Sequence, residues 1–510
     1  QMAACKPTVG LEPTPTPTLT PTPTLEPTPT LTPTPTPIPT LSPERVGGVE
    51  GIPDPKETNP ELFNLTRSDA PIPQFVRAME MGGIEVDPQE VVANLQYQPI
   101  TGVDGEQYVI GTYHLDPDPN QSGETLEGPI PLVIGEQREN REWGWGEATL
   151  RKLFEIRGIQ IGTELTGWWQ SDPNWRELVP KQANLALISW GLNWPEIEPK
   201  QGSFNFGIMD REVKFAQDNN MQVRGEVLIA SASGIPLPEW LTKGSFTKDQ
   251  VVEIMRNHVR TVMSHYKGKV SQWGVVSEPY LPPYRPNDFL YSKIGPEYIE
   301  IAFQTARETD PQATLIFMDT YNHSPSYDRN NGFTTNNTKI IVDRLNKLGL
   351  IDGVGLEMHI DASHPPKKED VLNTMRMYGV PVYITEMDVD MRNVDGSPEE
   401  KNILQSRIYS EILEAFIESS VGKSFSLWEM GDKFSWLEYP EASYTSKDAN
   451  PTVFGDNLDP KPAYFALLQT LTCFPHPDIG QSEALAGPVT HLNTIQAVFS
   501  ATRLCLIRAL

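Results

Sequence analysis

Cysteine is scarce in this chain, and long apolar runs are absent. The 510 residues include three cysteines, Cys5, Cys473 and Cys505, which show no CxxC spacing. An odd number of cysteines near the termini provides neither a disulfide framework nor a zinc site. No stretch of about 20 apolar residues is present, so the sequence predicts no membrane-spanning helix. We expect neither a metal nor a cofactor.

Basic residues are also few. The chain has 41 Lys and Arg against 67 Asp and Glu, which gives a formal net charge of −26. Such an excess of negative charge argues against a phosphate-binding surface, so nucleic acid is not an expected partner. A hydrophobic content of 38% with 11 tryptophans is enough for a sizeable core. The length suits one large barrel with appendages.

The N-terminal part predicts an anchor and a spacer. Residues 12–42 repeat Thr-Pro, which favours an extended polyproline II linker. Within residues 1–11, Met2-Ala3-Ala4-Cys5 is similar to the end of a bacterial lipoprotein signal, with Cys5 as the lipidated residue; the alternative is an incidental cysteine. Because the chain starts with Gln1, we expect an upstream signal to be missing. The prediction is an extracellular or bacterial cell-surface location.

Two regions carry no assigned chemistry. Residues 43–148 form a lead-in region, in which short β-type runs such as 107–113 alternate with Pro and Asp and predict strands and turns. Residues 473–510 form an unassigned tail.

Residues 149–472 show eight short apolar runs that alternate with helical periods. The runs are 158–163, 185–189, 222–229, 271–277, 314–318, 352–358, 381–385 and 424–428, and the helices include 248–264 and 397–419. This alternation predicts an α/β fold, the (β/α)₈ TIM barrel, with its active site at the carboxyl ends of the strands. The alternative is a doubly wound open sheet, which the absence of a Gly-rich nucleotide loop disfavours.

Two glutamates follow such runs directly. Glu278 ends Val275-Val276-Ser277-Glu278, and Glu386 ends Tyr383-Ile384-Thr385-Glu386. Parallel strands deliver side chains at their carboxyl ends, so the two carboxyls are candidates for the pair that glycoside hydrolysis needs. The alternative for either glutamate alone is a solvated loop residue.

Ordered motifs carry a family resemblance. Residues 198–206 read Glu-Pro-Lys-Gln-Gly-Ser-Phe-Asn-Phe and residues 384–388 read Ile-Thr-Glu-Met-Asp, and further motifs lie at 150–163, 223–225, 353–359, 428–436 and 460–464. Together they resemble glycoside hydrolase family 10, the endo-1,4-β-xylanase family. The resemblance covers about residues 149–472.

The resemblance implies a retaining mechanism on a xylan-like polysaccharide. It makes Glu278 the acid/base and Glu386 the nucleophile, with His359 helping to keep Glu386 ionised. Trp428 and Trp436 are expected to form walls of the sugar cleft, since pyranose C–H faces pack on indole. We expect a monomer.

The departures from the family pattern concentrate on the sugar-binding side. Ser277 replaces the Asn before the acid/base, Glu357 replaces a Gln, and Ser189, Trp190 and Asn193 replace a Glu-Asn pair and a Lys. Further departures are Gly274, Glu226, Ala230 and Ser231. Ser277 and Asn193 are therefore candidate substrate-binding residues of altered character, which predicts weak action on plain xylan, or a different or decorated β-glycan as substrate. The alternative function is surface carbohydrate binding on a barrel scaffold with weak or no catalysis.

Overall fold

The computed structural model describes residues 52–115, 126, 128–137, 142–165, 169–230, 237–279, 288–327, 332–438 and 449–473. The predicted spacer, Cys5 and the tail beyond Cys473 lie outside these residues. Within the described ranges, none of the helices combines the length and the apolar character needed to cross a membrane.

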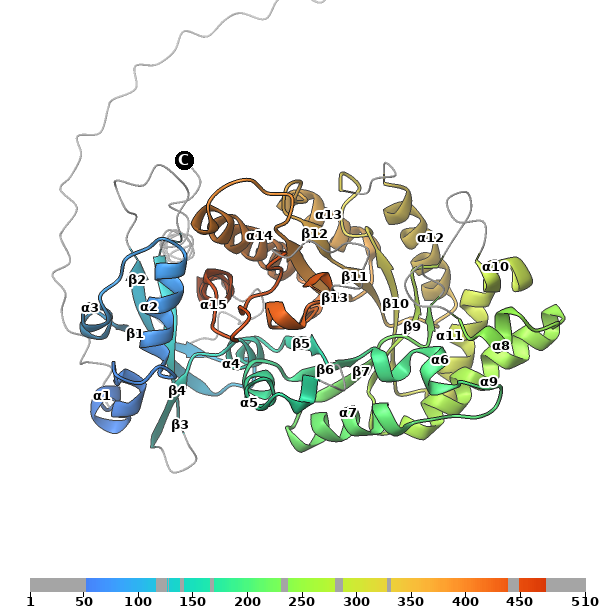
Figure 1. Cartoon of the computed structure of the whole chain (residues 1–510), viewed down its shortest axis with the longest axis horizontal. Coiled ribbons are helices and arrows are strands. Elements are labelled where there is room, and N and C mark those ends of the chain that lie inside the picture. The colour runs from blue at the N-terminus through green and yellow to red at the C-terminus, as the bar shows by residue number, and fades with distance from the viewer. Residues whose placement is uncertain are drawn as a thin grey trace, which may run out of the picture. The chain divides into compact units, whose positions relative to one another are not determined.

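Eight parallel strands close into a barrel, which confirms the predicted fold (Figure 1). In chain order they are β5 (Gln160–Glu164), β6 (Leu185–Ile188), β7 (Gln222–Gly225), β9 (Gln272–Ser277), β10 (Thr314–Thr320), β11 (Gly353–Glu357), β13 (Val382–Asp390) and β14 (Gly422–Leu427). The ring closes because β14 pairs with β5 and β9 pairs with β10. Each predicted strand is therefore present.

A helix follows each barrel strand. These helices are α5 (Pro173–Gln182), α7 (Gly207–Asp218), α9 (Lys248–Tyr266), α11 (Tyr298–Thr309), α12 (Phe333–Lys347), α13 (Lys368–Tyr378), α14 (Pro398–Ser419) and α15 (Pro462–Cys473). Two begin with a reciprocal cap, in which Thr247 pairs with Gln250 and Ser397 pairs with Glu400. Such capping boxes satisfy backbone donors that a helix start leaves free. Shorter elements complete the barrel: α4 (Leu150–Ile156), η2 (Trp169–Ser171), η3 (Trp190–Leu192), α6 (Trp194–Ile197), β8 (Ile229–Ala230), α8 (Glu239–Thr242), α10 (Phe289–Ile294), β12 (His359–Asp361), η4 (Asp432–Phe434) and η5 (Trp436–Glu438).

The barrel strands are buried on both faces, as parallel strands between a core and a helical layer must be. All six residues of β9 are buried, and Trp273 within it is 1% exposed. Gly225 of β7 makes room for this indole, because a Cβ at Gly225 would lie 2.6 Å from the Trp273 ring. Trp194 is also buried. The two tryptophans are core residues.

The lead-in region has strands, as predicted, together with helices. The helices are α1 (Pro55–Thr58), η1 (Pro60–Phe63), α2 (Pro71–Met81) and α3 (Pro88–Ala93), and the strands are β1 (Gln96–Thr101), β2 (Gln107–Leu115), β3 (Gly128–Gln137) and β4 (Trp143–Glu147). The strands form an antiparallel sheet in sequential order. The Phe75 ring of α2 packs edge-on against Phe465 of α15 at 5.2 Å, so the lead-in region shares a core with the last barrel helix.

Candidate active site

Glu278 lies directly after β9, at the carboxyl end of the barrel. Its φ of +44° falls in the left-handed region, which residues other than glycine seldom adopt. Its backbone N–H donates to the carbonyl of Met318 on β10 over 3.3 Å. A backbone held in such a conformation is a feature of functional sites, where the surrounding structure sustains the strain.

Glu386 lies within β13, where the strand is irregular. The pairing of β13 with β14 shifts register between Ile384 and Met387, so the backbone at Glu386 leaves the regular ladder. The carbonyl of Glu386 accepts a hydrogen bond from the N–H of Met358 over 3.0 Å. Both carboxyls, Glu278 and Glu386, are partly exposed at the same end of the barrel.

His359 connects Glu386 to a second carboxylate. Its Nε2 lies 3.3 Å from Oε2 of Glu386, and its Nδ1 lies 2.9 Å from Oδ2 of Asp388. Burial opposes a charged imidazole, but the charges and hydrogen bonds of Asp388 and Glu386 outweigh it and raise the pKa of His359 well above its usual value. A protonated His359 places positive charge beside Glu386, which favours the ionised form that a nucleophile needs.

Two tryptophans surround His359. The ring centroid of Trp436 lies 5.2 Å from that of His359, and the centroid of Trp428 lies 6.3 Å from it, both edge-on. Both indoles are partly exposed, in contrast to the buried Trp273 and Trp194. Apolar faces beside a carboxylate provide a surface for the C–H face of a sugar ring.

Ser277 is bonded to another carboxyl. The Ser277 hydroxyl donates to Oε1 of Glu357, the last residue of β11. Burial, followed by the charges of Glu386 and Glu278, raises the pKa of Glu357 well above its usual value. Ser277 and Glu357, which both depart from the family pattern, therefore contact each other in the fold.

Six barrel strands each place a glutamate at this end of the barrel. The six glutamates are Glu164, Glu226, Glu278, Glu357, Glu386 and Glu429. Glu164 accepts a hydrogen bond from the Ser189 hydroxyl and shares another with Glu429. Burial raises the pKa of Glu164 to about 7 and, together with the charge of Glu164, raises that of Glu429 well above its usual value. Two carboxyls can share a hydrogen bond only if one is protonated.

Glu226 is paired with a cation inside the barrel. Arg224 of β7 is fully buried, and its Nε lies 2.5 Å from Oε1 of Glu226. The same guanidinium donates to the hydroxyls of Ser424 and Ser426 on β14, over 3.1 and 2.9 Å. Burial raises the pKa of Glu226 to about 8 against the opposing effect of Arg224.

Asn193 and Trp190 lie in the segment that follows β6. Asn193 precedes α6 and makes no side-chain hydrogen bond with the part of the chain that the structure describes. The structure therefore does not connect it to the catalytic candidates. Trp190 is 48% exposed. It is the single tryptophan among the large hydrophobic side chains found exposed in the described ranges.

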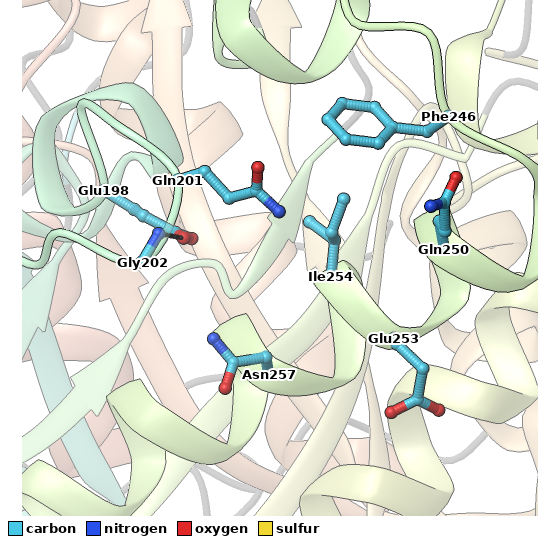
Figure 2. A pocket seen from close by; sticks show the side chains of 8 residues that line it. All are labelled: Glu198, Gln201, Gly202, Phe246, Gln250, Glu253, Ile254 and Asn257. Atoms are coloured by element: carbon cyan, nitrogen blue, oxygen red, sulfur yellow. Dashed lines mark hydrogen bonds between the residues drawn. The ribbon is translucent and has the colours of Figure 1, made fainter.

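A pocket of about 360 Å³ is lined by residues of the segment after α6, of α9 and of the chain just before α9 (Figure 2). Figure 2 shows Gln201 reaching from the segment after α6 toward Ile254 of α9. No predicted site residue lines it. Glu198 at its edge is buried and accepts hydrogen bonds from the Trp194 indole and the Gly202 N–H, both over 2.8 Å. The Glu198 carboxylate therefore has a structural role in holding this segment.

A metal site finds no support in the described residues, where no group of three or more His, Cys, Asp or Glu side chains has suitable geometry. The candidate chemistry is that of paired carboxyls.

Sequence reasoning missed the carboxyl pair of Glu164 and Glu429 and the role of Asp388 as partner of His359. Glu164 ends a β-type run, which is the signal that identified Glu278 and Glu386. Glu429 directly follows Trp428 in a quoted motif, but the sequence carried no sign of its contact with Glu164.

A closed (β/α)₈ barrel with carboxyls, a charged histidine and aromatic rings at its carboxyl end has the architecture of a glycoside hydrolase. The family model described as glycosyl hydrolase family 10 matches residues 149–470. The chain therefore belongs to glycosyl hydrolase family 10, which confirms the resemblance seen in the motifs.

Known relatives agree with this assignment. The chain is 32% identical over 338 residues to endo-1,4-beta-xylanase B of Thermotoga neapolitana, which covers 64% of this chain and 93% of the relative. It is 30% identical over 312 residues to the beta-1,4-xylanase of Dictyoglomus thermophilum, covering 58% and 84%. The crystal structure of xylanase 10B from Thermotoga maritima superposes with a TM-score of 0.58 at 30% identity, covering 64% of this chain and 98% of that structure.

Proposed function

We propose that this glycoside hydrolase cleaves internal β-1,4-glycosidic bonds of xylan or a related polysaccharide with retention of anomeric configuration. Glu278 acts as the acid/base and Glu386 as the nucleophile. The observation that carries the proposal is the contact of His359 with Glu386 at the end of the barrel where Glu278 also lies. The relatives named xylanases support the substrate class.

The mechanism follows from the charges that retention requires. One carboxyl must stay protonated to donate to the glycosidic oxygen, while an ionised carboxyl about 5–5.5 Å away attacks the anomeric carbon. His359, charged through Asp388, stabilises the anionic Glu386 before attack. After the leaving group departs, Glu278 becomes the base that activates water, and the covalent glycosyl ester on Glu386 is hydrolysed.

Product analysis tests this proposal. The protein should release reducing ends from xylan, and NMR of the first products should show the β-anomer before mutarotation. Glu386→Ala should abolish release while leaving polysaccharide binding intact. If wild-type protein binds xylan but releases no reducing ends, the chain is a carbohydrate-binding protein on a barrel scaffold.

We also propose that the enzyme acts as a monomer at the bacterial cell surface, anchored through Cys5 and held off the envelope by the Thr-Pro segment. The support is the sequence Met2-Ala3-Ala4-Cys5 and the proline density of residues 12–42. Cys5→Ser should move the protein from the membrane fraction to the medium. Deleting residues 6–48 should impair only action on insoluble or cell-bound polymer, and a large fall in turnover on a short soluble oligosaccharide would contradict the spacer.

A further inference from the structure

A third carboxyl, that of Glu357, lies near the catalytic pair of Glu278 and Glu386. Glu357 ends β11, and its side chain is 3% exposed. The charges of Glu386 and Glu278 both act on it, so it lies within electrostatic reach of both catalytic candidates. Glu357 has no role in the retaining mechanism of Glu278 and Glu386.

Hydrogen bonds of Glu357 and of the next residue connect this segment to the neighbours of both catalytic candidates. Oε1 of Glu357 accepts from the hydroxyl of Ser277, the residue before Glu278. On the other side, the N–H of Met358, the next residue along the chain, donates to the carbonyl of Glu386 over 3.0 Å. The printed hydrogen bond to the Glu357 carboxyl is thus made by the neutral hydroxyl of Ser277 and not by a cation.

The groups that face Glu357 are mostly acidic. They are Glu386 on β13, Glu278 after β9 and Asp319 on β10, with His359 two residues along its own segment. The imidazole of His359 is occupied by Glu386 and Asp388. In the part of the chain described, no Lys, Arg or His forms an ion pair with Glu357. The raised pKa of Glu357, caused by burial and then by Glu386 and Glu278, agrees with this uncompensated position.

We propose that Glu357 is a positioning residue that functions only as the protonated acid, which Ser277 holds as a neutral group near the two catalytic carboxyls. The inference rests on the proposed hydrolysis by Glu278 and Glu386. In the active form Glu386 carries the negative charge and Glu278 holds its proton. Ionisation of Glu357 adds a second buried negative charge near the nucleophile, which ends turnover.

This role has a consequence for the pH dependence of hydrolysis. Loss of the proton from either Glu278 or Glu357 inactivates the site. The alkaline limb of the pH–activity profile, where activity falls as the pH rises, is therefore set by both acids as a coupled pair. Removing the second acid leaves Glu278 alone to set that limb, which therefore moves to higher pH. The acidic limb should stay in place, because Glu357 is already neutral there.

Glu357→Gln tests the proposal, since the amide keeps the shape and a donor but cannot ionise. The alkaline limb of kcat/KM on xylo-oligosaccharides should move to higher pH, by about 0.3 unit for two acids of equal strength and by more if Glu357 is the stronger acid, with the acidic limb unchanged. An alkaline limb that stays in place or moves to lower pH would overturn the proposal. The matched control is Glu147→Gln, which removes a carboxyl of β4, outside the barrel, whose pKa burial raises to about 7; it should leave both limbs in place.

Ser277→Ala provides a second variant if Glu357→Gln does not fold. The Ser277 hydrogen bond lowers the pKa of Glu357, so its loss should move the alkaline limb upward as well. Infrared difference spectra give a readout without substrate: the protonated-carboxyl absorption near neutral pH should lose one component in Glu357→Gln, while those of the other buried carboxyls remain. If wild-type protein has no hydrolase activity, the proposed function fails, and this component still decides whether Glu357 holds a proton.

Discussion

The indole Nε1 of Trp436 donates a hydrogen bond to Oδ2 of Asp388 over 2.8 Å, and the same oxygen lies 2.9 Å from Nδ1 of His359. Trp436 was predicted from the sequence as a wall of the sugar cleft. The structure adds a polar role, since the indole orients the carboxylate that charges His359. A chain of contacts thus runs from Trp436 through Asp388 and His359 to Glu386.

Trp436→Phe should keep an apolar ring and remove the donor. Losing one hydrogen bond to a charged group costs about 1.5 kcal/mol, so kcat should fall about tenfold with little change in KM on soluble oligosaccharides. Trp428→Phe is the matched control, because the Trp428 indole makes no hydrogen bond with the described residues; it should change KM more than kcat. Equal effects in the two variants would show that the Trp436 indole serves only as an apolar surface.

Glu278→Ala should retain activity on aryl glycosides with good leaving groups, because these need little protonation. Glu386→Ala should be inactive on every substrate. Steady-state kinetics with added azide separates the roles, since azide should rescue only the Glu278 variant. Equal loss on activated and unactivated substrates, without rescue, would remove Glu278 as the acid/base.

Ser277→Asn should raise kcat/KM on xylo-oligosaccharides by less than about tenfold, or roughly 1.4 kcal/mol. The physical reason is that Ser277 is bonded to Glu357, so a new amide at 277 enters an unchanged acidic neighbourhood. The double exchange with Glu357→Gln should exceed the sum of the single changes, as contacting residues are not additive. Full additivity in this double-mutant cycle would contradict an energetic link between the two positions.

The carboxyl pair of Glu164 and Glu429 predicts how stability depends on pH. Burial raises the pKa of Glu164 to about 7, above the usual value of 4.5, and that of Glu429 rises as well. Between pH 4.5 and about 7, the native state binds protons that the unfolded chain has already released. The contribution of these groups to stability is therefore greatest below pH 4.5 and falls as the pH rises to about 7. Each group changes the free energy of unfolding by at most about 1.4 kcal/mol per pH unit. Urea denaturation at several pH values should show this slope, and Glu429→Gln should flatten it. A slope that Glu429→Gln leaves unchanged would assign the effect to other groups.

Lys461 and Asp432 form a buried ion pair at 3.0 Å, with side chains 4% and 3% exposed. Lys461→Met should lower the free energy of unfolding by about 3–5 kcal/mol, because it leaves the Asp432 charge buried without its partner. Lys214→Met breaks the exposed pair with Asp218 at 2.8 Å and should change stability little. Similar losses in the two variants would contradict the role of burial.

Local sequence was sufficient for the barrel, because its signals are short-range. Each β-branched run, such as Val275-Val276, needs only burial on both faces to become a parallel strand, and caps such as Ser397 with Glu400 lie within one helical turn. The rule that parallel strands present side chains at their carboxyl ends also pointed to Glu278 and Glu386. These features depend on neighbours in the chain and on the barrel topology alone.

Contacts between strands that are distant in the sequence determined how the site residues are paired and protonated. Ser277 meets Glu357, and Glu164 meets Glu429, only because the barrel closes with a particular register, and nothing near these residues in the chain encodes the partner. Their protonation is likewise a tertiary property, since a glutamate becomes a neutral acid only when burial and neighbouring charges penalise its ionised form. The sequence predicted which residue types reach the site, whereas the closed barrel determined which of them are paired, charged or protonated.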